Sequence, residues 1–205
     1  MGVVVPKDES VDWLLLKKVS RSFYLTLRLL PPSVRGSISL AYLLARLSDT
    51  EADGVQTEGE KELLARKEEI LSWLTRSPDR SEIEAVWTII REGQRYDGKR
   101  FVGGSGAPSD PLSGEELESY TYLVAGCVGE FWTRICLKRF RKFTRRPQGE
   151  MTMLGIHFGQ GLQLVNILRD REEDAGFGRV YIAPGARDAT IHWARACLDD
   201  AESYT

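Results

Sequence analysis

Two pairs of aspartates stand at helical spacing in the sequence. Asp49 and Asp53 are four residues apart, and Asp170 and Asp174 have the same separation. In a helix, residues i and i+4 lie on one face, where two like charges repel each other by roughly 0.2–0.5 kcal/mol. That repulsion brings a helix no benefit unless a cation lies between the carboxylates. The two pairs are therefore candidate ligands for metal ions.

Each aspartate pair extends along its segment as a longer polar stripe. Tyr42 and Arg46 precede the first pair on the same helical face, and Gln163 and Asn166 precede the second. A helix that is apolar on nearly all its other faces is buried, so each stripe should face an internal cavity. The apolar residues beside the two stripes are Leu40, Leu43, Leu44 and Leu47, and Leu162, Leu164, Val165, Ile167 and Leu168.

Buried carboxylates are paired with a cation or bind a metal ion. Hard carboxylate and amide oxygens suit Mg²⁺, which keeps several waters and shares its ligands with phosphate groups. Two such stripes that face each other predict an Mg²⁺-diphosphate clamp at the mouth of an apolar pocket.

A solvated acidic face is the alternative for these aspartates. The charged residues Arg169, Arg171, Glu172 and Glu173 crowd the second pair and favour that alternative. A calcium-binding EF-hand loop is excluded, because the required glycine and downstream glutamate are absent at the right spacing. The occurrence of two pairs, each in a leucine-rich segment, favours the metal site.

The segments that carry these residues are predicted to be helical. Apolar residues recur at i, i+3 and i+4 along the chain, and no alternating strand pattern of useful length appears. Pro31 and Pro32 end the first helix, and Ser33 is a candidate N-cap for the second. The fold class is therefore all-α, in a single domain over residues 1–205. The predicted helices cover 11–30, 34–53, 59–75, a stretch from 81 through 90, one from the capping box at 113–116 towards 143, 150–174 and 190–204.

Composition limits the class of protein. Of the 205 residues, 42% are hydrophobic and 28% charged, as in an ordinary globular domain. The net charge is −2, so no overall positive electrostatic field favours binding of nucleic acid. No signal peptide and no apolar run of roughly 20 residues is present, so a cytoplasmic location is expected. Cys127, Cys136 and Cys197 lack CxxC spacing and are expected to be buried free thiols.

Three blocks of the sequence resemble the squalene/phytoene synthase family and occur in the family's order. The N-terminal block is Ser20-Arg21-Ser22-Phe23, Leu30-Pro31-Pro32, Ala41-Tyr42 and Arg46-xx-Asp49-xxx-Asp53. The central block runs from Tyr122 to Glu130 and includes Gly126 and Gly129. The C-terminal block is Gln163-Leu-Val-Asn166-Ile-Leu-Arg169-Asp170, followed by Glu173-Asp174, Gly178-Arg179 and Tyr181.

The resemblance implies an isoprenoid-synthase-type helical bundle around a central apolar cavity. It also implies an Mg²⁺-dependent prenyl transferase that joins two farnesyl diphosphates head to head, through presqualene diphosphate, to squalene. The sequences of residues 20–53 and 120–136 are most similar to those of bacterial squalene synthases. Family members continue with further helices beyond the last residue of this chain, so the domain is expected to be incomplete at the C-terminus.

The resemblance further implies a role for each matched residue. Metal ligands would be Asp49, Asp53, Asp170, Asp174 and Asn166. The diphosphate would be bound by Ser20, Arg46, Gln163, Asn166 and Arg169. The residues acting beside the carbocation would be Phe23, Tyr42, Arg46 and Tyr122, since aromatic faces attract cations.

Alternatives remain for several of these residues. Phe23 and Tyr122 could be ordinary core residues, and Arg46 could simply neutralise Asp49. Gly126 and Gly129 are expected at close helix contacts, where the tail of the substrate could pass. NADPH is implied by the resemblance alone, because no glycine-rich dinucleotide motif is present.

The product and the partners also have alternatives. Phytoene synthases use a C20 substrate and need no hydride step. A dehydrosqualene synthase also needs no hydride step, and a truncated, non-catalytic helical binding protein is the remaining alternative. Farnesyl diphosphate or another allylic diphosphate is the expected partner, without nucleic acid. A basic cluster over residues 138–146 suggests peripheral contact with anionic membrane lipid, or a solvated helix end stabilised by the helix dipole.

Overall fold

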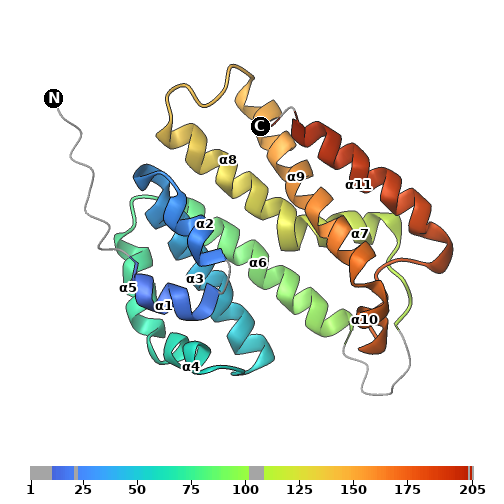
Figure 1. Ribbon diagram of the computed structural model, residues 1–205, viewed down its shortest axis with the longest axis horizontal. Coiled ribbons are helices and arrows are strands. Elements are labelled where there is room, and N and C mark those ends of the chain that lie inside the picture. Colours follow the sequence, from blue (N-terminus) through green and yellow to red (C-terminus); the bar gives the residue numbers. More distant parts are fainter. Residues whose placement is uncertain (1–10, 21–22, 102–108, 203, 205) are drawn as a thin grey trace. The chain divides into compact units, whose positions relative to one another are not determined.

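The computed structural model describes residues 11–20, 23–101, 109–202 and 204, apart from the side chains of Asp53 and Ala201. Within these residues every regular element is a helix (Figure 1). The all-α class predicted from the apolar spacing is therefore confirmed. Over the same residues, no helix is both long enough and apolar enough to cross a membrane.

The chain divides into two compact units. Unit 1 comprises Met1–Arg91 and Ile135–Arg141, and unit 2 comprises Glu92–Arg134 and Lys142–Thr205. The helices α6 (Arg80–Arg100) and α8 (Cys127–Arg139) contribute residues to both units. The first aspartate pair belongs to unit 1 and the second to unit 2. The single domain over residues 1–205 stays a prediction.

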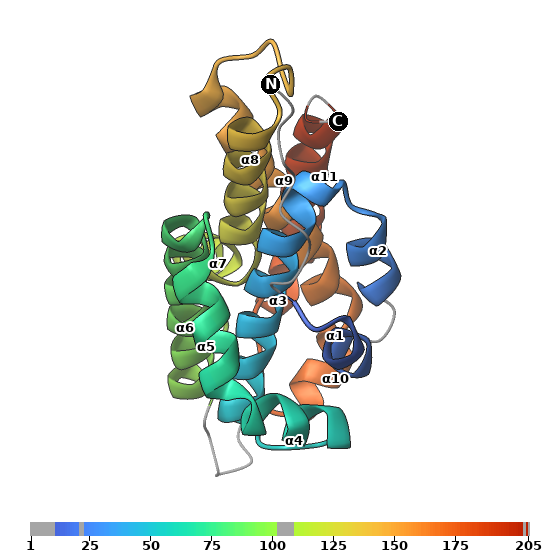
Figure 2. The ribbon, with the colours of Figure 1, turned by 90° about the vertical axis from the view of Figure 1, so that its left-hand side faces the viewer.

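Unit 1 is built around α3, and its leucines form the core. Leu40, Leu43, Leu44 and Leu47 are each no more than 1% exposed. The helix α4 lies across the C-terminal end of α3 (Figure 2), and α5 packs beside it. The prediction that leucines bury the first polar segment is therefore confirmed. The helices wholly in unit 1 are α1 (Trp13–Ser20), α2 (Phe23–Leu29), α3 (Pro32–Asp53), α4 (Glu58–Ala65) and α5 (Lys67–Arg76).

The prediction of one helix over residues 11–30 is wrong, because two helices cover this range. Trp13 of α1 and Tyr24 of α2 are in edge-to-face contact, with ring centroids 6.5 Å apart. In one straight helix, the eleven-residue separation would place them about 16 Å apart. Arg28 also lies over the Trp13 ring, 5.4 Å from its centroid. The helix α2 therefore folds back onto α1.

The two ends of α3 follow proline and glycine chemistry. The helix begins at Pro32, and its N-cap is Pro31. The prediction that Ser33 is the N-cap is therefore wrong, because Ser33 lies inside the helix. Proline suits the first turn because its missing N–H would have no helical partner there. At the other end, α3 stops at Asp53 as predicted, and Gly54 adopts a φ of +82° that favours glycine.

The helix predicted over 59–75 is broken at Arg66, which has φ −101° and ψ 14° and separates α4 from α5. A capping box starts α4: Thr57 Oγ1 accepts a hydrogen bond from Glu60 N at 3.2 Å, and the Glu60 carboxylate accepts one from Thr57 N at 2.9 Å. These bonds satisfy backbone donors that a helix start would otherwise leave unpaired.

A buried carboxylate joins three helices of unit 1. Asp79 precedes α6 and has a fully buried side chain. It accepts hydrogen bonds from the Ser37 hydroxyl of α3 and from Arg139 of α8, and Lys138 Nζ lies 2.9 Å from its Oδ1. Burial raises the pKa of Asp79, but Arg139, Ser37 and Lys138 together outweigh burial and lower this pKa below its ordinary value. The ion pairs keep the buried group charged.

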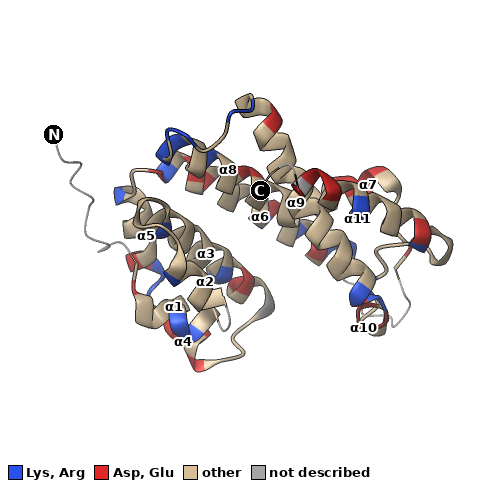
Figure 3. Ribbon diagram, turned by 45° about the horizontal axis from the view of Figure 1, so that its top comes forward, with Lys and Arg blue, Asp and Glu red and all other residues tan. Residues whose placement is uncertain are grey.

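The basic cluster over residues 138–146 begins at the end of α8 and continues into the following loop, blue in Figure 3. Lys138 pairs with Asp79 and Glu82, and Arg146 pairs with Glu150. Part of the cluster therefore serves contacts within the protein. Peripheral contact with membrane lipid stays a prediction.

In unit 2, α9 and α11 run side by side (Figure 1). The helix predicted from residue 113 towards 143 begins with the expected Ser113–Glu116 capping box. It is interrupted by the π-helix η1 and ends earlier, at Arg139. The elements wholly in unit 2 are α7 (Gly114–Thr121), η1 (Tyr122–Gly126), α9 (Gln148–Arg169), α10 (Arg171–Gly176), the short turn η2 (Pro184–Ala186) and α11 (Arg187–Glu202).

Glycines bring α9 into backbone contact with η1 and α8. A Cβ atom on Gly129 would lie 1.9 Å from the carbonyl oxygen of Gly155, and one on Gly159 would lie 2.3 Å from that of Ala125. A Cβ atom on Gly126 would lie 3.1 Å from Gln160. The close helix contact predicted at Gly126 and Gly129 is confirmed, and the neighbour there is α9.

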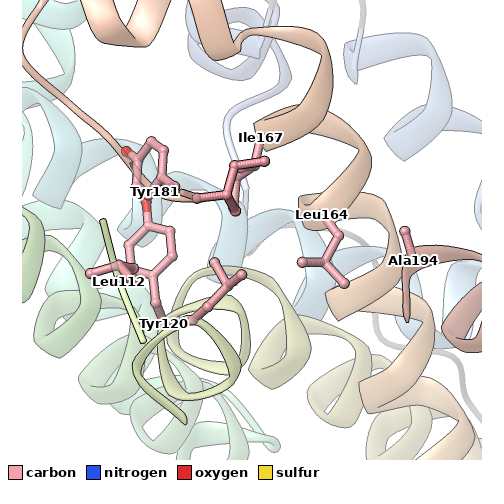
Figure 4. Close-up of a cluster of buried hydrophobic side chains, with 8 residues drawn as sticks. Leu112, Tyr120, Leu164, Ile167, Tyr181 and Ala194 are labelled. Carbon is pink, nitrogen blue, oxygen red and sulfur yellow. Dashed lines mark hydrogen bonds between the residues drawn. The ribbon is translucent and has the colours of Figure 1, made fainter. Parts of the chain in front are cut away.

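The core of unit 2 contains a pair of stacked tyrosines. Tyr120 of α7 and Tyr181 lie side by side, with Ile167 of α9 pointing towards Tyr181 (Figure 4). Leu112 N donates to the Tyr181 carbonyl oxygen at 3.2 Å. This bond ties the segment before α7 to the extended residues 180–182 and so fixes the chain that follows α10.

Candidate metal and diphosphate site

The first polar stripe lies along α3 in unit 1. Tyr42 stacks on Phe23 of α2, with ring centroids 5.3 Å apart and an interplanar angle of 27°. One turn further along α3, Arg46 Nη1 lies 3.3 Å from Asp49 Oδ2. Phe23 is 39% exposed, which argues against the alternative that it is an ordinary core residue. Tyr42, Arg46 and Asp49 therefore lie on one face of α3, and α2 adds the Phe23 ring that stacks on Tyr42.

Arg46 has a second and closer carboxylate partner, which the sequence analysis missed. Arg46 Nη2 lies 2.7 Å from Glu60 Oε1, and the Glu60 side chain is only 9% exposed. Hydrogen bonds from the backbone of Gln56 and Thr57 lower the pKa of Glu60, with a contribution from Arg46. Glu60 is the fourth residue of the Thr57–Glu60 capping box, a pattern readable in the sequence. Arg46 is thus fixed between α3 and α4.

Ser20 and Asp53 are the other two residues predicted in the N-terminal part of the site. Ser20 is the last residue of α1, is 3% exposed, and donates its hydroxyl to the Leu16 carbonyl oxygen at 2.5 Å. Asp53 ends α3, and its side chain lies outside the described part of the structure. The diphosphate role of Ser20 would require its hydroxyl to leave Leu16.

The second polar stripe begins in α9 of unit 2. Asn166 Nδ2 donates to Gln163 Oε1 at 3.4 Å, so these two predicted ligands lie together. Leu164 and Ile167 are buried, but Leu162 is 47% and Val165 40% exposed. The prediction that apolar packing surrounds this segment is therefore wrong for one of its faces.

The helix predicted over 150–174 ends at Arg169. Asp170 is the C-cap of α9, with φ −93° and ψ 7°, and α10 starts after it. The backbone N–H of Asp174 still bonds to the Asp170 carbonyl oxygen at 2.9 Å, so the turn between the two aspartates is retained. The second pair therefore spans a helix junction instead of one helical face.

The Arg169 guanidinium forms a two-point ion pair with the Asp170 carboxylate. Its Nε and Nη2 donate to Oδ1 and Oδ2, both at 2.6 Å. The hydrogen bonds from Arg169 hold the pKa of Asp170 below its ordinary value. The predicted diphosphate-binding residue Arg169 and the predicted metal ligand Asp170 therefore lie together, and in this structure they form an ion pair with each other.

Asp174 has the opposite electrostatic environment. Burial raises its pKa, and the negative charges of Asp170, Glu173 and Asp97 raise it further, against the lowering effect of Arg179. A carboxylate in such surroundings gains from a bound cation, because the cation stabilises its charged form. A pocket of about 200 Å³ opens beside Asp174, with Arg171, Arg179 and Tyr181 among its lining residues.

Tyr122 lies on η1, at the junction of α7 and α8. Its hydroxyl donates to Glu130 Oε2 at 2.7 Å, and Glu130 pairs with Arg134 at 2.6 Å. Burial, followed by the Glu130 hydrogen bond, raises the pKa of Tyr122 to about 12. The tyrosine stays neutral at physiological pH. Single-turn π-helices occur often at functional sites, which agrees with a role for Tyr122 beyond packing.

The donor set fits a hard divalent cation. Its side chains offer carboxylate and amide oxygens, which are the ligands that Mg²⁺ takes. Among the described residues, no three His, Cys, Asp or Glu side chains converge as a ready metal site. Diphosphate oxygens and waters would therefore have to complete the coordination, as is usual for Mg²⁺ bound with phosphate substrates.

Comparison with known proteins decides the family. The family described as squalene/phytoene synthase matches residues 16–184. This chain belongs to the squalene/phytoene synthase family. The matched range contains every candidate site residue, from Ser20 in α1 to Asp174 in α10.

Individual squalene/phytoene synthase relatives agree with this assignment. The presqualene diphosphate synthase of Rhodopseudomonas palustris is 29% identical over 168 residues, covering 78% of this chain and 57% of that protein. The phytoene synthase of Thermus thermophilus is 28% identical over 196 residues, covering 87% of this chain and 61% of that protein. The chain thus spans about three fifths of the length of these two relatives.

Solved structures of the squalene/phytoene synthase type share the fold. A dehydrosqualene synthase in complex with a ligand aligns with a TM-score of 0.62 at 23% identity, covering 98% of this chain and 75% of that one. A ligand complex of TcSQS aligns with a TM-score of 0.67 at 21% identity, covering 92% of this chain and 66% of that one. The helical bundle expected from the sequence resemblance is therefore confirmed.

Proposed function

We propose that this chain carries the metal-binding and diphosphate-binding residues of a prenyl transferase that condenses two allylic diphosphates head to head. The observation that carries the proposal is the family match over residues 16–184, because that range includes both polar stripes. Relatives named as presqualene diphosphate synthases support farnesyl diphosphate as the substrate. The proposed products are presqualene diphosphate and then squalene.

The proposed ligands of the cation are Asp49 and Asp53 in α3, and Asp170, Asp174 and Asn166 in unit 2. A bound Mg²⁺ would neutralise the charge that develops on the leaving diphosphate. Arg169 would exchange the Asp170 carboxylate for the diphosphate when the cation takes that carboxylate. Gln163 would keep its hydrogen bond to Asn166 and hold the amide oxygen of Asn166 in place.

The chain's aromatic residues would protect the carbocation left behind by the diphosphate. The stacked rings of Phe23 and Tyr42 present π-electron faces, which attract a cation by roughly 0.5–2 kcal/mol. Tyr122 contributes a third ring and remains neutral, since its pKa is raised to about 12. Arg46 is held by Asp49 and Glu60, and its guanidinium would act on the carbocation and the diphosphate from that position. Apolar walls would exclude water, which would otherwise trap the cation.

A product assay tests this function. The chain is incubated with Mg²⁺ and either farnesyl or geranylgeranyl diphosphate, with and without NADPH, and the products are identified by mass spectrometry. We expect presqualene diphosphate from the C15 substrate without NADPH and squalene with it. Phytoene from the C20 substrate, or dehydrosqualene without NADPH, would instead assign the chain to those synthases. Absence of Mg²⁺-dependent diphosphate release would leave a non-catalytic binding protein.

A further inference from the structure

A carboxylate outside both polar stripes contacts the segment that follows α10. Asp97 lies in the part of α6 that belongs to unit 2. The Tyr181 hydroxyl donates to Asp97 Oδ1 at 3.4 Å, and Arg179 Nη1 lies 3.8 Å from Asp97 Oδ2. The Asp97 side chain is 24% exposed, so its charge is partly shielded from water. Asp97 therefore needs a cation nearby, and Arg179 supplies one.

Arg179 is also close to the candidate metal ligand Asp174. Its backbone N–H bonds to the Asp174 carbonyl oxygen at 2.9 Å, across the turn at Gly178, which has φ +77°. The positive charge of Arg179 lowers the pKa of Asp174, against burial and the neighbouring carboxylates, which raise it. Among the described residues, however, the ion pair of Arg179 is made with Asp97. One guanidinium therefore lies within reach of two carboxylates.

The packing fixes where Asp97 meets its partners. Tyr181 is held by stacking on Tyr120 at 5.1 Å between centroids and by an edge contact with Phe101 at 4.8 Å. Its hydroxyl thus reaches Asp97 from a ring that cannot easily turn away. Asp97 lies in the last turn of α6, and Phe101, which contacts Tyr181, directly follows this helix. The helix therefore sets the position of the Asp97 carboxylate relative to Tyr181.

We propose that Asp97 is a positioning residue of the candidate site, which draws Arg179 away from Asp174 and so leaves the Asp174 carboxylate available to a metal ion. The inference rests on the proposed function, because it takes Asp174 as a metal ligand. Asp174 lines the same pocket as Arg179, and after Asp97 it is the next carboxylate whose charge raises the pKa of Arg179. Without the Asp97 charge, Arg179 would therefore turn to Asp174. A guanidinium on Asp174 would then compete with the metal ion for the same oxygens.

Metal binding to the whole 205-residue chain tests this inference without a turnover assay. Mn²⁺ is titrated in the presence of inorganic diphosphate, and bound Mn²⁺ is measured by electron paramagnetic resonance. We expect Asp97→Asn to weaken Mn²⁺ binding by about tenfold, as is typical when a residue behind a metal ligand is lost. Adding Arg179→Gln to Asp97→Asn should restore binding towards that of the unsubstituted chain, since the competing guanidinium is gone.

Two further variants sharpen the experiment. Glu92→Gln removes an exposed carboxylate from the same helix and should leave Mn²⁺ binding unchanged. Tyr181→Phe keeps the ring contacts and the Asp97 charge but removes the hydroxyl, which donates to Asp97 and accepts from Tyr120, so it should weaken binding by less than Asp97→Asn does. This variant keeps the proposal testable if Asp97→Asn does not fold, and circular dichroism reports the fold of each.

The outcomes separate this inference from the proposed function. If the unsubstituted chain shows no diphosphate-dependent Mn²⁺ binding, the proposed function fails and the inference fails with it. If that chain binds Mn²⁺ and Asp97→Asn binds it equally well, the inference alone is overturned. The inference is also overturned if Arg179→Gln does not restore binding in the double variant, or if Arg179→Gln alone weakens it, because Arg179 would then serve the ligand directly.

Discussion

Arg169 and Asp170, adjacent in sequence, form a two-point ion pair at the end of α9, with both N–O distances at 2.6 Å. The pair is exposed to solvent, and exposed ion pairs contribute little to stability because water screens them. The carboxylate can therefore exchange its partner at low cost. An Asp170 bound to Arg169 in the free protein and to a cation in the complex is compatible with the proposed function.

The first prediction concerns Asp170 itself. Asp170→Asn should abolish Mg²⁺-dependent diphosphate release, because the amide carries no charge to hold the cation. Helix content, measured by far-ultraviolet circular dichroism, should not change, since the side chain is not part of the core. Asp188→Asn, an exposed change at the start of α11, is the matched control and should retain the release activity. Full activity of Asp170→Asn would remove Asp170 from the metal ligands.

The second prediction concerns the buried Asp79. Asp79→Asn should lower the free energy of unfolding by roughly 3 kcal/mol at pH 7, because it leaves Lys138 and Arg139 without the carboxylate that neutralises them. Urea denaturation measures the change. The exposed Arg80–Glu84 pair provides the control: Glu84→Gln should cost less than about 0.5 kcal/mol.

The same carboxylate gives a third prediction, on acid stability. The pKa of Asp79 is lower in the folded protein than the ordinary value of 3.8. Its contribution is therefore fully present above the unfolded-state pKa and is lost as the pH falls below about 4 through the folded-state pKa. Unfolding curves recorded between pH 2 and pH 7 (roughly the acid limb of the profile) should show a shallower acid loss for Asp79→Asn than for the unsubstituted chain. Equal acid slopes would contradict this assignment.

The fourth prediction concerns the backbone contact between α8 and α9. Gly129→Ala would bring a Cβ atom to 1.9 Å from the Gly155 carbonyl oxygen, and a backbone atom cannot give way as a side chain can. We expect a loss of about 3 kcal/mol in the free energy of unfolding, at the upper end of overpacking costs. Gly98→Ala in α6 meets nothing within 4 Å and should be neutral or stabilise by up to about 1 kcal/mol. A neutral Gly129→Ala would show that the helices can separate freely.

The fifth prediction uses the cysteines, which are free and buried as the sequence predicted. Burial raises the pKa of Cys127 to about 12, and it also raises the pKa values of Cys136 and Cys197. Because the thiolate is the reactive form, a thiol reagent at pH 8 (about half a unit below the ordinary cysteine pKa) should react slowly with the folded chain. In guanidinium chloride all three thiols should react at once. Rapid reaction of any thiol in the folded chain would contradict the burial.

Helix class and approximate helix limits followed from the sequence because they depend on local spacing and on proline, glycine and capping residues. The capping box at Ser113–Glu116 and the stop at Gly54 are examples. The break at Asp170 has no such local signal, since no proline or glycine lies between Asn166 and Asp174. The fold-back of α2 on α1 depends on the Trp13–Tyr24 contact, which spacing alone does not reveal.

The candidate site was predictable as far as its residues share a helix. The Tyr42–Arg46–Asp49 stripe and the Gln163–Asn166 pair follow from periodicity alone. Asp97 is remote in sequence from Arg179 and Tyr181, and their contact arises only from tertiary packing. A lone aspartate in a polar helix end gives no signal of that kind, which is why sequence reasoning did not find it.

The π-helix η1 accommodates one extra residue between α7 and α8. An α-helix advances by about 100° per residue, and a π-turn accommodates one residue more than an α-turn. Deleting a single residue between Tyr122 and Gly126 would therefore convert η1 into regular α-helix and leave α8 close to its present rotation relative to α7. Gly129 and Thr133 would still face Gly155 of α9. The same deletion within α7 would instead turn the residues that follow it by about 100° and move Gly129 away from Gly155. The helix packing therefore tolerates a one-residue shortening at η1 but not in the helix before it.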